Sequence, residues 1–208
     1  MASEQLLSPC HRSPLTPSAA GFESFEDTLD GYRFQYPADW VAVRSAGADV
    51  FLRAPAGSGG AEENLFVEAS SPSSTVFASL DQLGSPEAAG AALVAQYLVE
   101  FTSTRLGVRR EAELLGTPAL RTGPDGVRYL DAEVAVRSYA SPQQYGVTAE
   151  ERGAPALEWR RRLRTTLGVG NGRLYALRLQ CAEERAEATA GVAQAIRGSF
   201  RVLPVGKS

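Results

Sequence analysis

Residues 125–136 read DGVRYLDAEVAV, and this stretch decides the fold class of the chain. It opens on an Asp-Gly pair, which is preferred in the tight turns of β-hairpins. Apolar and polar side chains then alternate, with Leu130, Ala132, Val134 and Val136 in one set and Tyr129, Asp131, Glu133 and Arg137 in the other. Because successive side chains of a strand point to opposite faces, the alternation predicts an antiparallel sheet with one packed face and one wet face.

The same signals recur on both sides of this stretch. Asp30-Gly31 and Asn171-Gly172 are further tight-turn pairs, each lying between two short apolar patterns. The other predicted strands span residues 25–29, 32–36, 50–53, 65–69, 111–121, 157–167, 174–181 and 199–202. Since tight turns join antiparallel neighbours, a single antiparallel sheet is expected.

Two helices are predicted to flank this sheet. Ser85 can cap the first, Pro86 suits its first position and Glu87 suits the positive end of its dipole. Its apolar side chains recur at helical spacing, at Leu93, Val94, Tyr97, Leu98 and Phe101. The second helix is the alanine-rich segment 183–197.

These elements predict the α+β class: an antiparallel β-sheet flanked by helices, in two or three layers. Residues 22–205 are expected to form a single domain. Residues 1–21 are rich in serine and proline, and they are interpreted as a disordered leader or a residual targeting segment.

Composition excludes several functional classes. The formal net charge of −3 gives no basic field of the kind that nucleic acid requires. No stretch approaches the roughly 18 apolar residues of a transmembrane helix. The single histidine, His11, lies in the leader, and no nucleophile elbow, Walker loop or dinucleotide fingerprint occurs. We therefore expect a protein that is not an enzyme and has no transmembrane segment.

The two cysteines form no disulfide framework. Cys10 lies in the leader, and Cys181 ends an apolar strand pattern. They could pair in an oxidising compartment. Cys181 is better interpreted as a small buried hydrophobic residue.

Six segments follow one another in an order that resembles the PsbP family. They are GYRFQYPADW at 31–40, NLFVE at 64–68, SLDQLGSPE at 79–87, DGVRYLDAE at 125–133, NGRLYAL at 171–177 and SFRV at 199–202. The segment at 79–87 is the most specific, because it is close to the family's leucine-glycine-serine/threonine-proline-glutamate helix start. The resemblance covers roughly residues 25–203.

The resemblance implies an α/β/α sandwich in the chloroplast thylakoid lumen, peripheral to the membrane, which docks on a photosystem. Its best-known members retain calcium and chloride at the manganese cluster of photosystem II, within the oxygen-evolving complex. Paralogues serve photosystem assembly or repair, or the plastid NAD(P)H dehydrogenase complex. The implied partners are thus a photosystem core or assembly intermediates at the lumenal membrane face, and calcium is a cofactor by resemblance alone.

Three departures favour a PsbP-like or PsbP domain-containing protein over the oxygen-evolving subunit itself. Ala186 stands where the family commonly has tryptophan. The loop expected at residues 139–155 is longer than the family pattern, and the leader does not resemble the N-terminal segment of that subunit.

Arginines on one predicted strand are the first candidates for contact with a partner. Arg160, Arg162 and Arg164 fall on its predicted outward face, where guanidinium groups can pair with carboxylates. The alternative is a solvated face that guards against edge aggregation. Arg109 and Arg110, expected in a helix-to-strand loop, are further candidates.

Aromatic residues supply the other contact candidates. Tyr139 and Tyr145 fall in the predicted long loop and are expected to be exposed. Trp40 and Trp159 could anchor an interface. Trp159 is expected in the core because it shares its face with leucines, and Trp40, just beyond a strand end, is expected there too.

Asp125, Asp131 and Glu133 are weak candidates for a calcium site, since hard cations bind carboxylate oxygens. Their spacing matches no known calcium loop. Asp125 is better explained by its turn, and the alternation places Asp131 and Glu133 on the predicted wet face.

Two other functional classes stay open. The core also resembles a small eukaryotic Ran-GTPase-binding fold, so a GTPase-binding regulator outside the plastid is the alternative function. A small-molecule or ion carrier would need a buried pocket with converging polar groups, and the sequence shows none.

Overall fold

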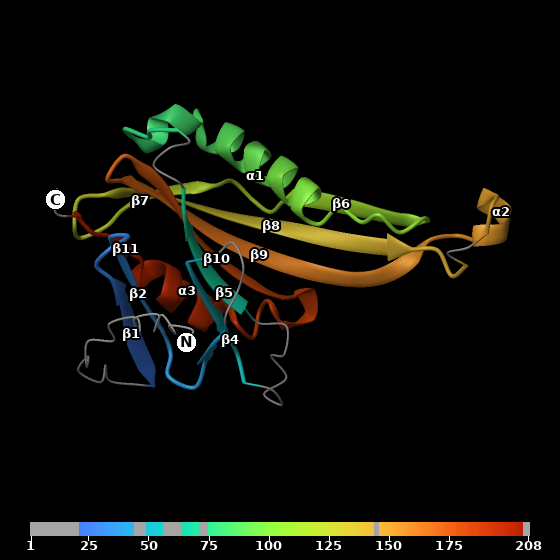
Figure 1. Ribbon diagram of the computed structural model, residues 1–208, viewed down its shortest axis with the longest axis horizontal. Helices are drawn as coiled ribbons and strands as arrows, with labels where there is room; N and C mark the ends of the chain where they lie inside the picture. Colours follow the sequence, from blue (N-terminus) through green and yellow to red (C-terminus); the bar gives the residue numbers. More distant parts are fainter. Residues whose placement is uncertain (1–20, 44–48, 56–63, 71–74, 144–145, 206–208) are drawn as a thin grey trace, which may run out of the picture.

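The computed structural model describes residues 21–43, 49–55, 64–70, 75–143 and 146–205 (Figure 1). Its strands are β1 (Phe22–Asp27), β2 (Tyr32–Pro37), β3 (Val41–Ala42), β4 (Val50–Arg53), β5 (Asn64–Ala69), β6 (Val108–Leu114), β7 (Ala119–Thr122), β8 (Arg128–Ala140), β9 (Ala156–Gly170), β10 (Arg173–Ala182) and β11 (Arg201–Val202). Its helices are η1 (Leu80–Leu83), α1 (Pro86–Glu100), α2 (Ala149–Arg152), η2 (Glu183–Arg185) and α3 (Ala190–Ser199).

The strands form two antiparallel sheets rather than the single sheet predicted. The large sheet has eight strands in the order β3-β4-β5-β10-β9-β8-β6, with β7 also paired to β8. The small sheet has the order β1-β2-β11. The predicted α+β class, with an antiparallel sheet flanked by helices, is confirmed.

The centre of the large sheet is covered on both faces, so the prediction of a wet face is wrong. On one face, α1 and η1 pack over a cluster that includes Leu130, Val134 and Leu163. On the other face, the small sheet and α3 pack over Tyr175 and Leu177. Figure 1 shows α1 and α3 on opposite sides of these strands. The result is the three-layered α/β/α arrangement.

Tyr129 joins the small sheet to the large one. Its hydroxyl accepts a hydrogen bond from the backbone N–H of Val202 at 2.9 Å and donates one to Asp125 at 2.9 Å. Its ring lies 6.0 Å from that of Phe200. Burial is the main cause that raises the pKa of Tyr129 to about 12. The tyrosine therefore holds the C-terminal strand against β8.

Two predicted elements are interrupted. The strand predicted at 111–121 is split into β6 and β7, because Pro118 has no N–H for the ladder and Gly116 has a positive φ of 69°. The helix predicted at 183–197 begins only at Ala190. Before it, Ala186 is buried against the sheet, and its carbonyl accepts a hydrogen bond from Arg164 at 2.8 Å.

The first helix is confirmed, and each predicted turn pair lies between two paired strands, although the loops that contain Asp30-Gly31 and Asp125-Gly126 are longer than two residues. Asn171 and Gly172 have φ values of 53° and 71° between β9 and β10, as a type I′ turn requires. Ser85 caps α1 by accepting a hydrogen bond from the N–H of Ala88. Among the described residues, no helix is both long and apolar enough to cross a membrane.

Gly31→Ala is expected to destabilise the protein more than Gly126→Ala. Both glycines have positive φ, 75° and 78°, which costs a non-glycine residue about 1–2 kcal/mol. A Cβ at Gly31 would also lie 2.8 Å from the carbonyl oxygen of Leu203 and would collide with Val205, whereas a Cβ at Gly126 meets nothing within 4 Å. Urea unfolding of the two variants checks this difference. Equal losses would show that the turn at Gly31 is not packed against the C-terminal segment.

Candidate functional site

The β8–β9 hairpin extends beyond the packed layers as an arm (Figure 1). We define the arm as residues 108–111 of β6, 137–140 of β8, 156–161 of β9 and the described part of 141–155. Pairing continues outward to Ala140 and Ala156, and α2 lies at the tip. Thr148 and Glu151 form a capping box that begins α2.

Arg109 and Arg110 lie in β6 rather than in the predicted loop, so their side chains point to opposite faces of the sheet. Arg109 has 64% of its side chain exposed and lies 2.9 Å from Glu111. Its guanidinium carbon is 5.0 Å from the ring centroid of Tyr139. Tyr139 lies in β8, directly opposite Arg109, and not in a loop. This cation–π pair is accessible to a partner.

Arg110 connects the arm to the end of α1. Its Nε donates to the carbonyl of Phe101 at 3.1 Å, and its Nη1 donates to the hydroxyl of Ser138. Its guanidinium carbon lies 4.9 Å from the ring centroid of Trp159. Burial is the main cause that lowers the pKa of Arg110. This arginine therefore has an internal structural role.

Trp159 and Trp40 are partly buried at the edges of the two hydrophobic clusters. Trp159 packs edge-on against Phe101, with ring centroids 5.8 Å apart. On its other side the guanidinium carbon of Arg161 lies 4.5 Å from its ring centroid. Neither tryptophan is an exposed anchor.

Glu158 occupies a β-bulge in the arm, where the register shifts between Ser138 and Tyr139. It accepts a hydrogen bond from Ser138 Oγ at 2.7 Å, and it lies 3.0 Å from Arg105 and 3.6 Å from Arg110. These groups hold the pKa of Glu158 below its ordinary value, and the Ser138 hydroxyl is the largest cause. No sequence pattern marked this residue, because a bulge depends on the pairing of two distant strands.

Arg160, Arg162 and Arg164 share one face, as predicted, but η2 and α3 progressively cover that face. Their side chains are 41%, 18% and 8% exposed. Arg162 lies 2.9 Å from Glu133 and also pairs with Glu183. Arg164 lies 3.2 Å from Glu133. Only Arg160 is placed on the accessible surface that was predicted for all three.

The weak calcium candidates do not converge on a cation site. Asp125 accepts the hydroxyl hydrogen of its neighbouring tyrosine. Asp131 lies 2.9 Å from Arg121 and 3.3 Å from Arg197, and Glu133 is shared by two arginines. Arginines already engage Asp131 and Glu133, and Asp125 is bound to Tyr129 and to the N–H of Val127 in its turn, so the three residues do not fit a calcium ion. Across the described ranges, no group of three or more His, Cys, Asp or Glu side chains could hold a metal.

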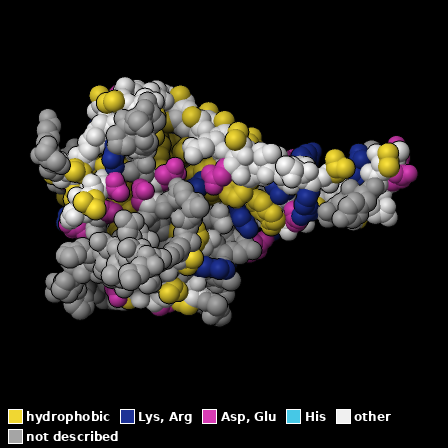
Figure 2. Space-filling model, viewed as in Figure 1, with side chains coloured by type: hydrophobic (Ala, Val, Ile, Leu, Met, Phe, Trp, Pro, Cys, Tyr) yellow, Lys and Arg dark blue, Asp and Glu magenta, His cyan; other side chains and the backbone are white. Residues whose placement is uncertain are grey.

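Strand pairing brings three accessible arginines of the arm together with one tyrosine on what we call the basic face: Arg109, Arg137, Arg160 and Tyr139. Arg137 stands opposite Arg160 in the register, and it was not proposed from the sequence. The alternating pattern of residues 129–137 could have suggested that Arg137 lies on this face. Only the register of the strands places it beside Arg109 and Arg160. Each arginine also has a nearby carboxylate, from Glu111, Glu113 and Glu184 respectively. Figure 2 shows acidic and basic side chains next to one another along the arm.

Large apolar side chains are exposed around the arm as well. Val147, next to α2, is 86% exposed, and Leu106 and Leu157 are also exposed. Tyr145, the remaining contact candidate, lies outside the described residues. The arm therefore combines charge, an aromatic ring and apolar side chains.

The PsbP family model matches residues 20–202. The chain therefore belongs to the PsbP family. It is 49% identical over 163 residues to PsbP domain-containing protein 1, chloroplastic, of Arabidopsis thaliana. That match covers 78% of this chain and 55% of the relative, so the chain spans about half the relative's length.

One solved structure agrees with the family assignment. The solution structure of cyanobacterial PsbP (CyanoP) from Synechocystis sp. PCC 6803 matches with a TM-score of 0.61 and 25% identity, over 92% of this chain and 98% of that one. The Ran-binding protein Mog1p of Saccharomyces cerevisiae matches with a TM-score of 0.47 and 10% identity, over 87% and 95% of the two chains. A likeness at that level supports no functional inference.

Glu133→Ala is expected to lower the free energy of unfolding by about 2–3 kcal/mol. The change leaves Arg162 and the buried Arg164 without their shared carboxylate, and such losses cost roughly 3–5 kcal/mol where both partners are fully buried. Glu133 is 26% exposed, which reduces the penalty. The matched control is Glu184→Ala, whose exposed pair with Arg160 contributes little. If urea unfolding shows the two variants to be equally stable, the network does not hold η2 and α3 on the sheet.

Glu183 is expected to stabilise the fold only while it is ionised. The hydrogen bond from Arg162 is the main cause that lowers its pKa below the ordinary value of 4.5. Its contribution is therefore complete above that value and is lost as pH falls through the lower pKa of the folded state. The stability difference between the unsubstituted protein and Glu183→Gln should be constant near about pH 6 and shrink below pH 4.5. Unfolding titrations across this range measure it, and a difference that grows on acidification would contradict the assignment.

Proposed function

We propose that this PsbP-family protein is a non-catalytic accessory factor of chloroplast photosynthesis that docks on a photosystem from the lumenal side of the thylakoid membrane. It would act as an extrinsic subunit or as an assembly and stability factor. Membership of the family supports this proposal, and so does the likeness to a chloroplastic PsbP domain-containing protein and to CyanoP. Calcium has no part in the proposal, because arginines engage Asp131 and Glu133, and Asp125 accepts hydrogen bonds within its own turn.

The observation that carries the proposal is the projecting arm. A protein that works by docking needs a surface that its own core does not use, and the basic face lies beyond the packed layers (Figure 1). Guanidinium groups are suited to pairing with carboxylates of a partner, often in bidentate geometry. An aromatic ring beside them is typical of the residues that dominate binding energy at interfaces.

The charge pattern favours reversible docking. Each arginine of the basic face already has a glutamate neighbour on the surface. Exposed ion pairs of this kind contribute little to stability, so a partner's carboxylate can replace the internal one at small cost. Complementary charges at an exposed rim mainly raise the rate of association, and salt screens them. We therefore expect docking that is fast and sensitive to salt.

Charge reversal on the basic face is expected to release the protein from thylakoid membranes. Arg109→Glu and Arg160→Glu together should weaken binding about tenfold, because repulsion replaces attraction at two positions. The control is Arg128→Glu, at the opposite end of β8, which lies nine and eleven residues along the strand from the positions opposite Arg160 and Arg109, roughly 30–36 Å at about 3.3 Å per residue. Each tagged, full-length variant is added to isolated thylakoids, and the complexes are recovered in mild detergent at increasing salt.

Recovery with photosystem subunits, lost in the double variant and kept in the control, is the expected result. Equal retention of both would show that the arm is not the contact. In a separate fractionation of cells that express the tagged protein, its recovery from cytosol or nucleus with a GTPase would overturn the photosynthetic role itself.

A further inference from the structure

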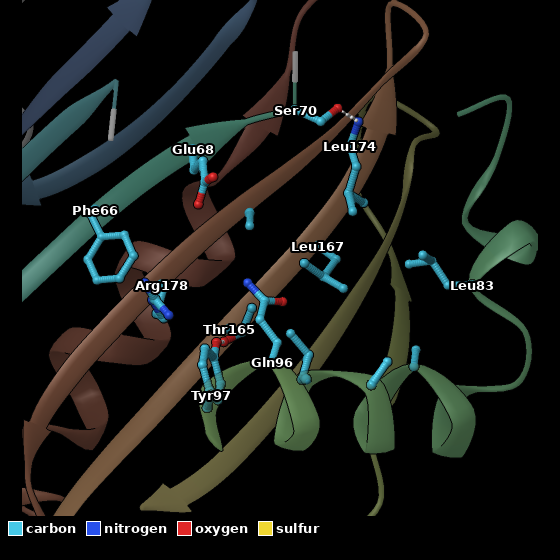
Figure 3. A pocket seen from close by; sticks show the side chains of 14 residues that line it. Phe66, Glu68, Ser70, Leu83, Gln96, Tyr97, Thr165, Leu167, Leu174 and Arg178 are labelled. Atoms are coloured by element: carbon cyan, nitrogen blue, oxygen red, sulfur yellow. Dashed lines mark hydrogen bonds between the residues drawn. The ribbon is translucent and has the colours of Figure 1, made fainter. Parts of the chain in front are cut away.

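A pocket opens between α1 and the β5–β10–β9 part of the large sheet (Figure 3). Its volume is about 200 Å³. The apolar part of its lining comes mainly from Ala89, Ala92, Leu93, Leu167, Leu174 and Ala176. Figure 2 shows hydrophobic side chains in a band between the helix and the strands beneath it. This region is separate from the basic face of the arm, which lies on the other face of the sheet.

The size of the pocket suits a small ring compound. An apolar cavity of about 150 Å³ in another protein holds one benzene molecule. About 200 Å³ therefore accommodates a substituted ring or two fused rings. The helix leaves this space open because Ala89 and Ala92 present only methyl groups toward it.

Four of the polar residues that line the pocket lie together at one end, whereas Ser70 lies beside Leu174 and accepts a hydrogen bond from its N–H. In Figure 3, Gln96, Tyr97, Thr165 and Arg178 lie together, whereas Leu83, Leu167 and Leu174 lie toward the opposite side. The hydroxyls of Tyr97 and Thr165 are hydrogen bonded to each other. This is the arrangement of typical ligand sites, where an apolar lining carries a few placed polar groups.

Arg178 has an unused hydrogen-bond donor at this end. Its side chain is 9% exposed, and its Nη1 pairs with Glu100. Its guanidinium carbon lies 3.7 Å from the ring centroid of Phe66 and 5.0 Å from that of Tyr97. Its Nε is buried and finds no hydrogen-bond acceptor among the described residues. An unsatisfied buried donor is destabilising, and a ligand acceptor would remove that penalty.

The charges around the pocket favour a neutral ligand. Glu100 already compensates Arg178, so an anion would have to compete with it. Glu68 lines the pocket and is exposed, and its carboxylate would repel an anion further. A cation would instead be repelled by the guanidinium group of Arg178. A neutral molecule with one accepting oxygen meets neither penalty.

We propose that this pocket binds a neutral, mainly apolar compound of one or two rings, whose carbonyl or ether oxygen accepts a hydrogen bond from Arg178 Nε. The apolar rings lie between the alanines of α1 and the leucines of the sheet. This binding function goes beyond docking and does not depend on it.

The first test uses prodan, a neutral naphthalene ketone whose fluorescence reports the polarity around it. Titration of the full-length protein should give saturable binding with a blue-shifted emission. Ala92→Trp places a large ring at the mouth of the pocket and should weaken binding at least tenfold. Ala91→Trp is the matched control, since Ala91 is the exposed neighbour that does not line the pocket. Equal binding by the two variants, or none by the unsubstituted protein, would overturn the proposal.

The second test separates the hydrogen bond from the apolar contact. Acetylnaphthalene, ethylnaphthalene and naphthoate have similar shapes but carry a ketone, a hydrocarbon and an anion. The ketone should displace prodan about tenfold better than the other two. Arg178→Lys keeps a positive charge for Glu100 but lacks the Nε donor, so it should remove the advantage of the ketone over the hydrocarbon. Stronger displacement by naphthoate, or an advantage that survives in Arg178→Lys, would contradict the assigned ligand class.

Discussion

The antiparallel pairing of β8 with β9 is the constraint on which the rest of the structure depends. The two strands have 13 and 15 residues, which is longer than the layers that cover them. At one end Tyr129 and Leu130 are buried between the layers, and at the other end the pair continues into the arm. The core therefore positions the docking surface directly, because the same two strands build both.

Because both faces of the β8–β9 pair are covered, the charged side chains on these strands need partners of opposite charge inside the protein. The strands bring Asp131, Glu133 and Arg164 beneath η2 and α3, where isolated charges would be costly. Each has a partner of opposite charge, and Arg164 also donates to the carbonyl of Ala186. These contacts fix where the C-terminal segment crosses the sheet. They also explain why residues that alternate like a solvated face are part of the packed interior.

The arm and the pocket both lie where the other layers leave part of the large sheet uncovered. The arm arises where β6, β8 and β9 extend beyond the layers, and the arginines of its basic face lie on the side of the sheet that the C-terminal segment covers farther in. The pocket lies on the opposite face, where α1 does not cover β5 and β10 completely. A contact on the arm and a ligand in the pocket can therefore be tested independently.

The sequence by itself determined what depends on neighbours along the chain. Asp30-Gly31 and Asn171-Gly172 set hairpins through backbone conformation, Ser85 started α1, and period-two alternation identified the strands and the α+β class. Tertiary structure alone decided that Arg164 is buried, that Arg137 joins Arg109 and Arg160, and that Arg178 faces a pocket. Alternation says only that two sets of side chains lie on opposite faces. What covers each face is decided by contacts between distant residues, such as Tyr129 with Val202, 73 positions apart.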